Sequence, residues 1–141
     1  MPKTVLTIDD DTAITELLAM LLRTHGYEVL TANNGEEGIK AIKDMKPHVV
    51  VLDLMMPGMD GWQVCKHVRT FSNVPIVILS ALDDPAMIAS ALDAGADDYL
   101  VKPVSSSILV AHLNRLIRRT GNIEMPNQVA TRQSNTQPTV P

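Results

Sequence analysis

The chain has 141 residues, a formal net charge of -4, 45% hydrophobic residues and a single cysteine. A chain of this length normally forms one domain, which can fold without a metal or a disulfide. The lone Cys65 excludes an internal disulfide. The sequence also contains no run of about 20 apolar residues, the length that a membrane helix needs. The net charge of -4 argues against direct binding of nucleic acid, because neutralising its phosphate backbone needs clustered Lys and Arg. We therefore expect a cytoplasmic protein without a signal peptide that binds neither nucleic acid nor membranes directly.

Short apolar runs alternate along the chain with segments whose apolar residues recur every three or four positions. The runs predict strands at residues 5–8, 28–32, 48–52, 74–79 and 99–101. Four of the intervening helices are predicted from capping residues: Asp11 before the first, Asn34 before the second, Asp84 with Pro85 at the fourth, and Ser105 or Ser106 before the fifth. The third helix is predicted from its apolar stripe of Trp62, Cys65 and Val68. This alternation predicts an α/β fold with a parallel sheet covered on both faces.

Residues 121–141 differ from the rest in composition. They contain no aromatic residue, and Glu124 and Arg132 are their only charged residues. Such a segment buries too little apolar surface to offset the entropy of ordering it. We therefore expect a domain over residues 1–120, followed by a disordered tail or the start of a linker.

Polar residues collect where the predicted strands end, which is where doubly wound sheets bind ligands. These residues are Asp9, Asp10 and Asp11 after the first strand, Asn33 after the second, Asp53 after the third, Ser80 after the fourth and Lys102 after the fifth. Carboxylates that lie together repel one another unless a cation binds them, and an all-oxygen ligand set favours Mg2+. Because Mg2+ commonly shares its coordination shell with a phosphate, the pattern predicts a site for phosphate, Mg2+ and Lys102.

Several of these residues also have an ordinary structural explanation. Asp11 directly precedes a periodic segment and is better explained as a helix cap than as a ligand. Ser80 and Lys102 mean little alone and gain weight only from their place at the same edge. Cys65 lies in the apolar stripe of a predicted helix, so we expect a core residue and not a nucleophile.

Four segments of the chain resemble the receiver domain of two-component response regulators. They are I-D-D-D at 8–11, V-V-V-L-D-L-M-M-P-G-M-D-G at 49–61, I-V-I-L-S-A at 76–81 and G-A-D-D-Y-L-V-K-P at 95–103. The resemblance covers residues 3 to about 120 in the order and spacing of that family. It implies a flavodoxin-like doubly wound sheet of five parallel strands in the order 2-1-3-4-5, with five helices.

The resemblance also implies a function and a set of site residues. The protein would be a phosphorylation-activated switch that takes its phosphoryl group from a sensor histidine kinase and catalyses only its own phosphorylation and dephosphorylation. Carried over residue by residue, the resemblance makes Asp53 the phosphoacceptor, and Asp10, Asp53 and the Met55 backbone carbonyl the ligands of Mg2+, with Asp9 acting through water. It implies that Ser80 and Lys102 contact the phosphoryl oxygens. It also implies that Tyr99 is the aromatic switch and that the Lys102–Pro103 bond is cis. Met55 and Leu82 would flank the approach of the water that hydrolyses the phosphoryl group.

Two other classes of protein remain as alternatives. A Mg2+-dependent phosphohydrolase with an aspartyl nucleophile uses the pattern D-x-D-x-T, but Ala13 stands where the threonine would follow Asp9, and Asp53 would have no role. A non-phosphorylatable interaction module of the same fold would not need the full set of site residues. The resemblance is greatest to receivers that precede winged-helix DNA-binding domains, although a single-domain regulator or another architecture also fits.

A phosphorylation-dependent homodimer is also implied, through the face of the fourth helix, fifth strand and fifth helix. The residues concerned are Ile88, Asp97, Asp98, Ile108, His112 and Arg119. Ile88 and Ile108 stand where receivers of this type usually carry a basic and an acidic residue, and His112 stands where arginine is usual. Either the isoleucines extend the core and the dimer is lost, or they meet across the symmetry axis; Asp98 could pair with His112.

Overall fold

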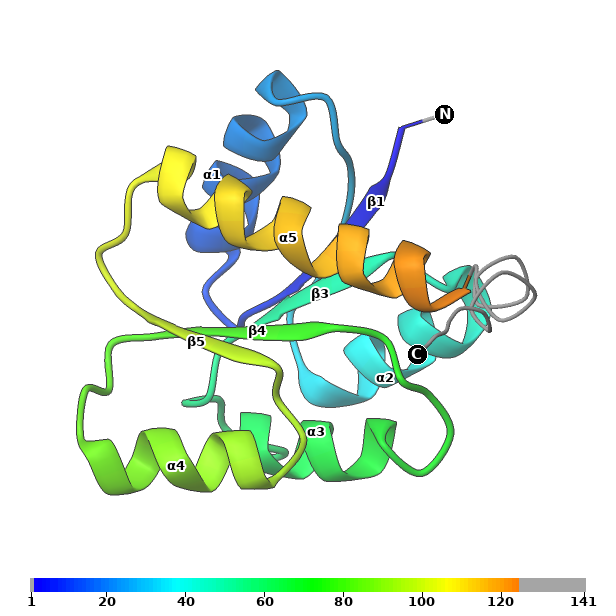
Figure 1. The fold of residues 1–141 in the computed structure, drawn as a ribbon. Coiled ribbons are helices and arrows are strands. Elements are labelled where there is room, and N and C mark those ends of the chain that lie inside the picture. Colours follow the sequence, from blue (N-terminus) through cyan, green and yellow to red (C-terminus); the bar gives the residue numbers. More distant parts are fainter. Residues whose placement is uncertain (1, 125–141) are drawn as a thin grey trace, which may run out of the picture.

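The computed structural model describes residues 2–124, with side chains up to Thr120, and contains a single five-stranded parallel sheet. The strands lie in the order β2-β1-β3-β4-β5 (Figure 1) and are β1 (Thr4–Ile8), β2 (Glu28–Ala32), β3 (Val49–Leu52), β4 (Ile76–Ser80) and β5 (Asp98–Val101). The helices are α1 (Thr12–Thr24), α2 (Gly35–Met45), α3 (Gly61–Val68), α4 (Pro85–Asp93) and α5 (Ser106–Glu124). The predicted α/β class and strand order are confirmed.

The sheet lies between two helical layers, with α1 and α5 on one face and α2, α3 and α4 on the other (Figure 1). The central strand β3 shows why its apolar run is unbroken. Val49 and Val51 pack into the core on the α1 and α5 face, whereas Val50 and Leu52 pack into the core on the opposite face. All four residues are buried, so every position of the strand has to be apolar.

The predicted helix caps are confirmed by hydrogen bonds to the first free N–H groups. The Asp11 carboxylate accepts from Ala13 N–H, that of Asp84 accepts from Ala86 N–H, and the Asn34 side chain accepts from Glu37 N–H. At the last helix the choice between two serines falls on Ser105, whose hydroxyl accepts from Ile108 N–H at 3.3 Å.

Several strand ends differ from the prediction by one residue, and two boundaries differ by more. The fourth strand begins at Ile76 and not at 74, because Pro75 has no N–H and the Val74 N–H donates to the Ser72 hydroxyl. Helix α5 continues to Glu124, so residues 121–124 belong to a helix and not to the tail that we expected from 121. The rest of that expected tail lies outside the described residues. Within the described part of the chain, no helix is both long and apolar enough to span a membrane.

Candidate phosphoacceptor site

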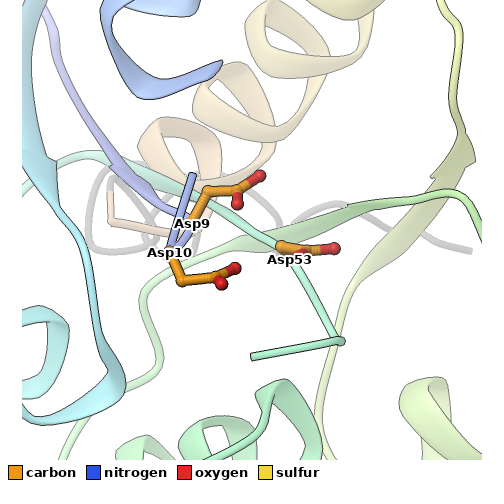
Figure 2. Close-up of side chains that lie close together, drawn as sticks. All are labelled: Asp9, Asp10 and Asp53. Carbon is orange, nitrogen blue, oxygen red and sulfur yellow. The ribbon is translucent and has the colours of Figure 1, made fainter. Parts of the chain in front are cut away.

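Three carboxylates from two neighbouring strands meet at the carboxyl edge of the sheet. Asp9 and Asp10 follow β1 and Asp53 follows β3, and Figure 2 shows their side chains extending to the same side of the sheet. One oxygen of each carboxylate lies within 4.8 Å of the other two. Asp9 and Asp53 are buried, and Asp10 is exposed. This donor set consists of oxygen atoms alone, so it fits a hard cation such as Mg2+.

Asp53 is held firmly by the sheet. Its N–H donates to the Ile8 carbonyl at 3.0 Å, which extends the ladder between β1 and β3 by one residue. Beside it, Gly61 N–H donates to the Leu54 carbonyl at 2.9 Å, and this bond fixes the start of α3 against the loop that follows β3. The nucleophile proposed from the sequence therefore directly follows a strand that is buried at every position.

The charges at this edge are poorly balanced. Burial raises the pKa of the Asp53 carboxyl, and the negative charge of Asp9 raises it further. Lys102 and the backbone N–H groups of Met55 and Leu54 act in the opposite direction but do not cancel the shift. A bound cation would relieve both the burial and the repulsion, so the electrostatics favour a metal ion at this place.

Lys102 pairs with Asp9 and not with Asp53. Its ammonium lies 3.1 Å from Oδ2 of Asp9, whose side chain is only 7% exposed. The Lys102 N–H donates to the Ser80 carbonyl at 2.9 Å, and the Lys102–Pro103 peptide bond is cis, as the sequence predicted. The ammonium of Lys102 therefore neutralises part of the negative charge of the carboxylate cluster.

Ser80 and Tyr99 both bind the peptide groups of Leu82, in the loop between β4 and α4. The Leu82 N–H donates to the Ser80 hydroxyl at 3.3 Å, and the Tyr99 hydroxyl donates to the Leu82 carbonyl at 2.7 Å. Burial raises the pKa of the Tyr99 phenol, so it stays a hydrogen-bond donor at neutral pH. The two predicted switch residues are thus joined through one loop residue.

The chain matches the family model described as response regulator receiver domain over residues 5–114. The chain belongs to this family. The strand order and the acidic cluster at the carboxyl edge agree with this family, and the phosphohydrolase alternative is not favoured.

Transcriptional regulators resemble this chain over about half of their own length. The transcriptional regulatory protein AfsQ1 of Streptomyces coelicolor is 41% identical over 119 residues, which cover 84% of this chain and 52% of that protein. The probable transcriptional regulator ycf27 of Cyanophora paradoxa is 45% identical over 120 residues, or 85% of this chain and 50% of that protein. The chain spans about half the length of these relatives.

Solved receiver structures share the fold over nearly their whole length. The Francisella response regulator 1452 receiver domain matches this chain with a TM-score of 0.79 and 36% sequence identity. The match covers 84% of this chain and 98% of the Francisella chain. A two-component response regulator from Clostridium difficile has a TM-score of 0.80 and 33% identity, with the same coverage of both chains.

The face of α4, β5 and α5 differs in detail from the charged face expected of such receivers. His112 and Arg115 both pair with Asp98 within the chain, at 2.5 and 2.8 Å. The Asp97 carboxylate binds Arg69 at 2.9 Å and Ile76 N–H at 2.8 Å. Both aspartates are therefore engaged before any partner arrives.

Two residues of the receiver site received no role from the sequence. The sequence marks Asn33 only by its place at the end of a predicted strand, and nothing in the sequence marks Thr15. The Asn33 amide donates to the Asp9 carbonyl at 2.8 Å and to the Thr15 hydroxyl at 3.1 Å. A polar residue at the end of a strand was the signal for Asn33, whereas the contact with Thr15 depends on how α1 packs beside β2.

Proposed function

We propose that this receiver accepts a phosphoryl group on Asp53 from a sensor histidine kinase and thereby switches its face of α4, β5 and α5. The observation that carries the proposal is the group of three carboxylates whose oxygens lie within 4.8 Å of one another. Asp10, Asp53 and the backbone carbonyl of Met55 are the proposed ligands of Mg2+, with Asp9 acting through water. The bound ion would neutralise charge on the transferring group and hold it in line with Asp53.

The proposed transfer forms one bond and breaks one. An oxygen of the Asp53 carboxylate attacks phosphorus, the bond from phosphorus to the donor histidine nitrogen breaks, and its electron pair returns to the imidazole. Lys102 is close enough to lower the pKa of Asp53, so it can move from Asp9 toward the new phosphoryl oxygens. The sheet fixes the nucleophile, and the receiver therefore catalyses its own modification mainly by placing groups correctly.

The proposed switch uses the shared contacts of Leu82. A phosphoryl group adds about 1.5 to 2 negative charges and three acceptor oxygens, which attract the Ser80 hydroxyl. Turning toward the phosphoryl group removes the 3.3 Å bond from Leu82 N–H to Ser80, while Tyr99 still holds the Leu82 carbonyl. The loop after β4 then has two arrangements, and phosphorylation selects between them.

Acetyl phosphate with Mg2+ tests the proposed phosphoacceptor. Intact mass should rise by one phosphoryl group for the wild type and for Asp44→Asn, a matched charge change on the exposed side of α2, but not for Asp53→Asn. Equal labelling of Asp53→Asn would refute the assignment. Release of phosphate without a labelled protein would instead indicate a hydrolase, and neither product would indicate a non-phosphorylatable module.

We also propose that phosphorylation promotes a symmetric dimer with an apolar centre. Ile108 is 50% exposed on α5, and Leu92 and Val101 on the neighbouring elements are also exposed. Because Asp97 and Asp98 are engaged within the chain, new ion pairs across the interface would have to compete with existing ones. Burial of the isoleucine side chains is therefore the larger driving force, and Ile88 on α4, partly buried, would be the partner of Ile108.

Sedimentation in the presence of beryllofluoride and Mg2+ tests this dimer. We expect a dimer at both low and high salt, and a monomer for Ile108→Asp, with Arg119→Ala showing a smaller effect. A monomer of the wild type throughout, or a dimer that dissociates in salt, would contradict the apolar interface without bearing on Asp53.

A further inference from the structure

Asn33 joins three segments that carry or support the carboxylate site. Its side-chain amide donates one hydrogen bond to the Asp9 carbonyl at 2.8 Å and a second to the Thr15 hydroxyl at 3.1 Å. Its backbone N–H donates to the Glu37 carboxylate at 3.0 Å, at the start of α2. Asn33 thus connects the turn after β1 with the first turns of α1 and α2.

These bonds hold the backbone of Asp9 on both sides. The Asp9 N–H donates to the Ala32 carbonyl at 3.1 Å, and the Asp9 carbonyl accepts from Asn33. The far end of the clamp is firm, because Thr15 is only 2% exposed and its hydroxyl also donates to the Thr12 carbonyl at 3.1 Å. The end of β2 therefore determines where the Asp9–Asp10 turn lies.

The turn needs such support because its carboxylates repel Asp53. Carboxylate oxygens of Asp9, Asp10 and Asp53 lie within 4.8 Å of one another, so their negative charges repel, and the single ammonium of Lys102, 3.1 Å from Asp9, cannot balance all three. A loop free to move would carry Asp9 and Asp10 away from Asp53 and widen the cluster before a cation arrived. Cation affinity depends on ligand number and on the rigidity of the site, so a held turn binds more tightly.

We propose that Asn33 is a positioning residue that sets the Mg2+ affinity of this receiver by holding the Asp9–Asp10 turn against the repulsion from Asp53. Asn33 touches neither the ion nor the phosphoryl group, and it acts through the backbone of Asp9. The inference rests on the proposed Mg2+ site. Groups that orient metal ligands in this way typically change affinity by about 10- to 100-fold when they are removed.

The test is a Mg2+ titration of Asn33→Ala against the wild type. Trp62, the only tryptophan of the chain, follows Gly61, whose N–H donates to the carbonyl of Leu54, the residue after Asp53. Trp62 can report binding by fluorescence, with calorimetry as a second readout. We expect the dissociation constant for Mg2+ to rise about 10-fold or more. The labelling rate by acetyl phosphate should recover at saturating Mg2+, because Asp53 and Lys102 are unchanged.

Asn34→Ala is the matched control for a general loss of stability. The side chain of the neighbouring Asn34 caps α2 by accepting from Glu37 N–H and does not hold the Asp9 backbone. Its loss should therefore lower the melting temperature and leave the Mg2+ affinity unchanged. Thr15→Val, which removes only one of the two amide acceptors, should weaken Mg2+ binding less than Asn33→Ala. Equal affinity of Asn33→Ala and wild type, or an equal loss in Asn34→Ala, would overturn the inference. A wild type that binds no Mg2+ would overturn the proposed site itself.

Discussion

Gly61→Ala should damage both stability and phosphorylation, although helix propensity alone predicts the opposite. A Cβ at Gly61 would lie 2.5 Å from the Asp53 carbonyl oxygen and 2.7 Å from Leu54 Cα. Both are backbone atoms, so neither can turn away as a flexible side chain would. Overpacking of this kind typically costs about 1–3 kcal/mol, whereas replacing glycine by alanine in a helix gains at most about 1 kcal/mol. The clash therefore decides the sign.

The expected loss can be measured in two ways. A net destabilisation of about 1–2 kcal/mol should lower the melting temperature by roughly 4–8 °C. Because the clash displaces the carbonyl of Asp53, labelling by acetyl phosphate below the melting transition should slow by about 10-fold or more, since misplacement by about 1 Å can cost 100-fold in rate.

Gly58→Ala is the matched control in the same loop. Gly58 has a positive φ of 74° and no atom within 4 Å of an added Cβ, so alanine there is strained by its backbone without contacting Asp53. It should lower the melting temperature but label at the wild-type rate. If Gly61→Ala were as stable as the wild type and labelled equally fast, the reasoning from close packing against Asp53 would be wrong.

Three further outcomes follow from the surroundings of the site. Met55 is 58% exposed and Leu82 is partly buried, and neither can orient a water through a hydrogen bond; Met55→Asn or Leu82→Asn should therefore shorten the lifetime of the phosphoryl group several-fold in a phosphate-release assay, and unchanged lifetimes in both would contradict this. Because the pKa of Asp53 is raised in the folded protein, its ionised form destabilises the fold. Without a metal, Asp53→Asn should therefore have a higher melting temperature than the wild type at pH 7. This difference should shrink as the pH falls through the Asp53 pKa toward the ordinary value of 3.8. Burial raises the pKa of the Cys65 thiol to about 11, so Ellman's reagent at pH 8 should react only in step with unfolding by denaturant; rapid reaction of the folded protein would contradict the burial.

Most of the fold could be predicted because local signals and the sheet agree. Each predicted cap is used, and the apolar run of β3 faces two cores, as expected for a central parallel strand. The end of α5 could not be predicted, because Gly121 and the polar residues after it carry no apolar stripe. Periodicity reports where a helix packs against the core and not how far it continues beyond it.

The site could be predicted to the level of residues but not of contacts. Strand ends and the family resemblance identified Asp9, Asp10 and Asp53, and the structure brings their oxygens together. That Lys102 pairs with Asp9 could not be read from the sequence, because the two are 93 positions apart and Asp53 lies in the same cluster. Which carboxylate a lysine contacts depends on the directions of side chains on neighbouring strands. The sequence pattern predicts only the strand on which a residue lies and the face of the sheet to which it points.

The arrangement separates rigid groups from movable ones. Asp53 is fixed by its bond to the Ile8 carbonyl on a fully buried strand. Lys102 and the Ser80 hydroxyl are held by single contacts, at 3.1 Å to Asp9 and at 3.3 Å from Leu82 N–H. In the proposed switch, both contacts are exchanged for contacts with a phosphoryl group. A nucleophile has to keep its place for in-line attack, whereas a switch has to move once the charge has changed. The two requirements are met because the sheet ends between them: packing holds Asp53, and the loops after β4 and β5 carry the groups that respond.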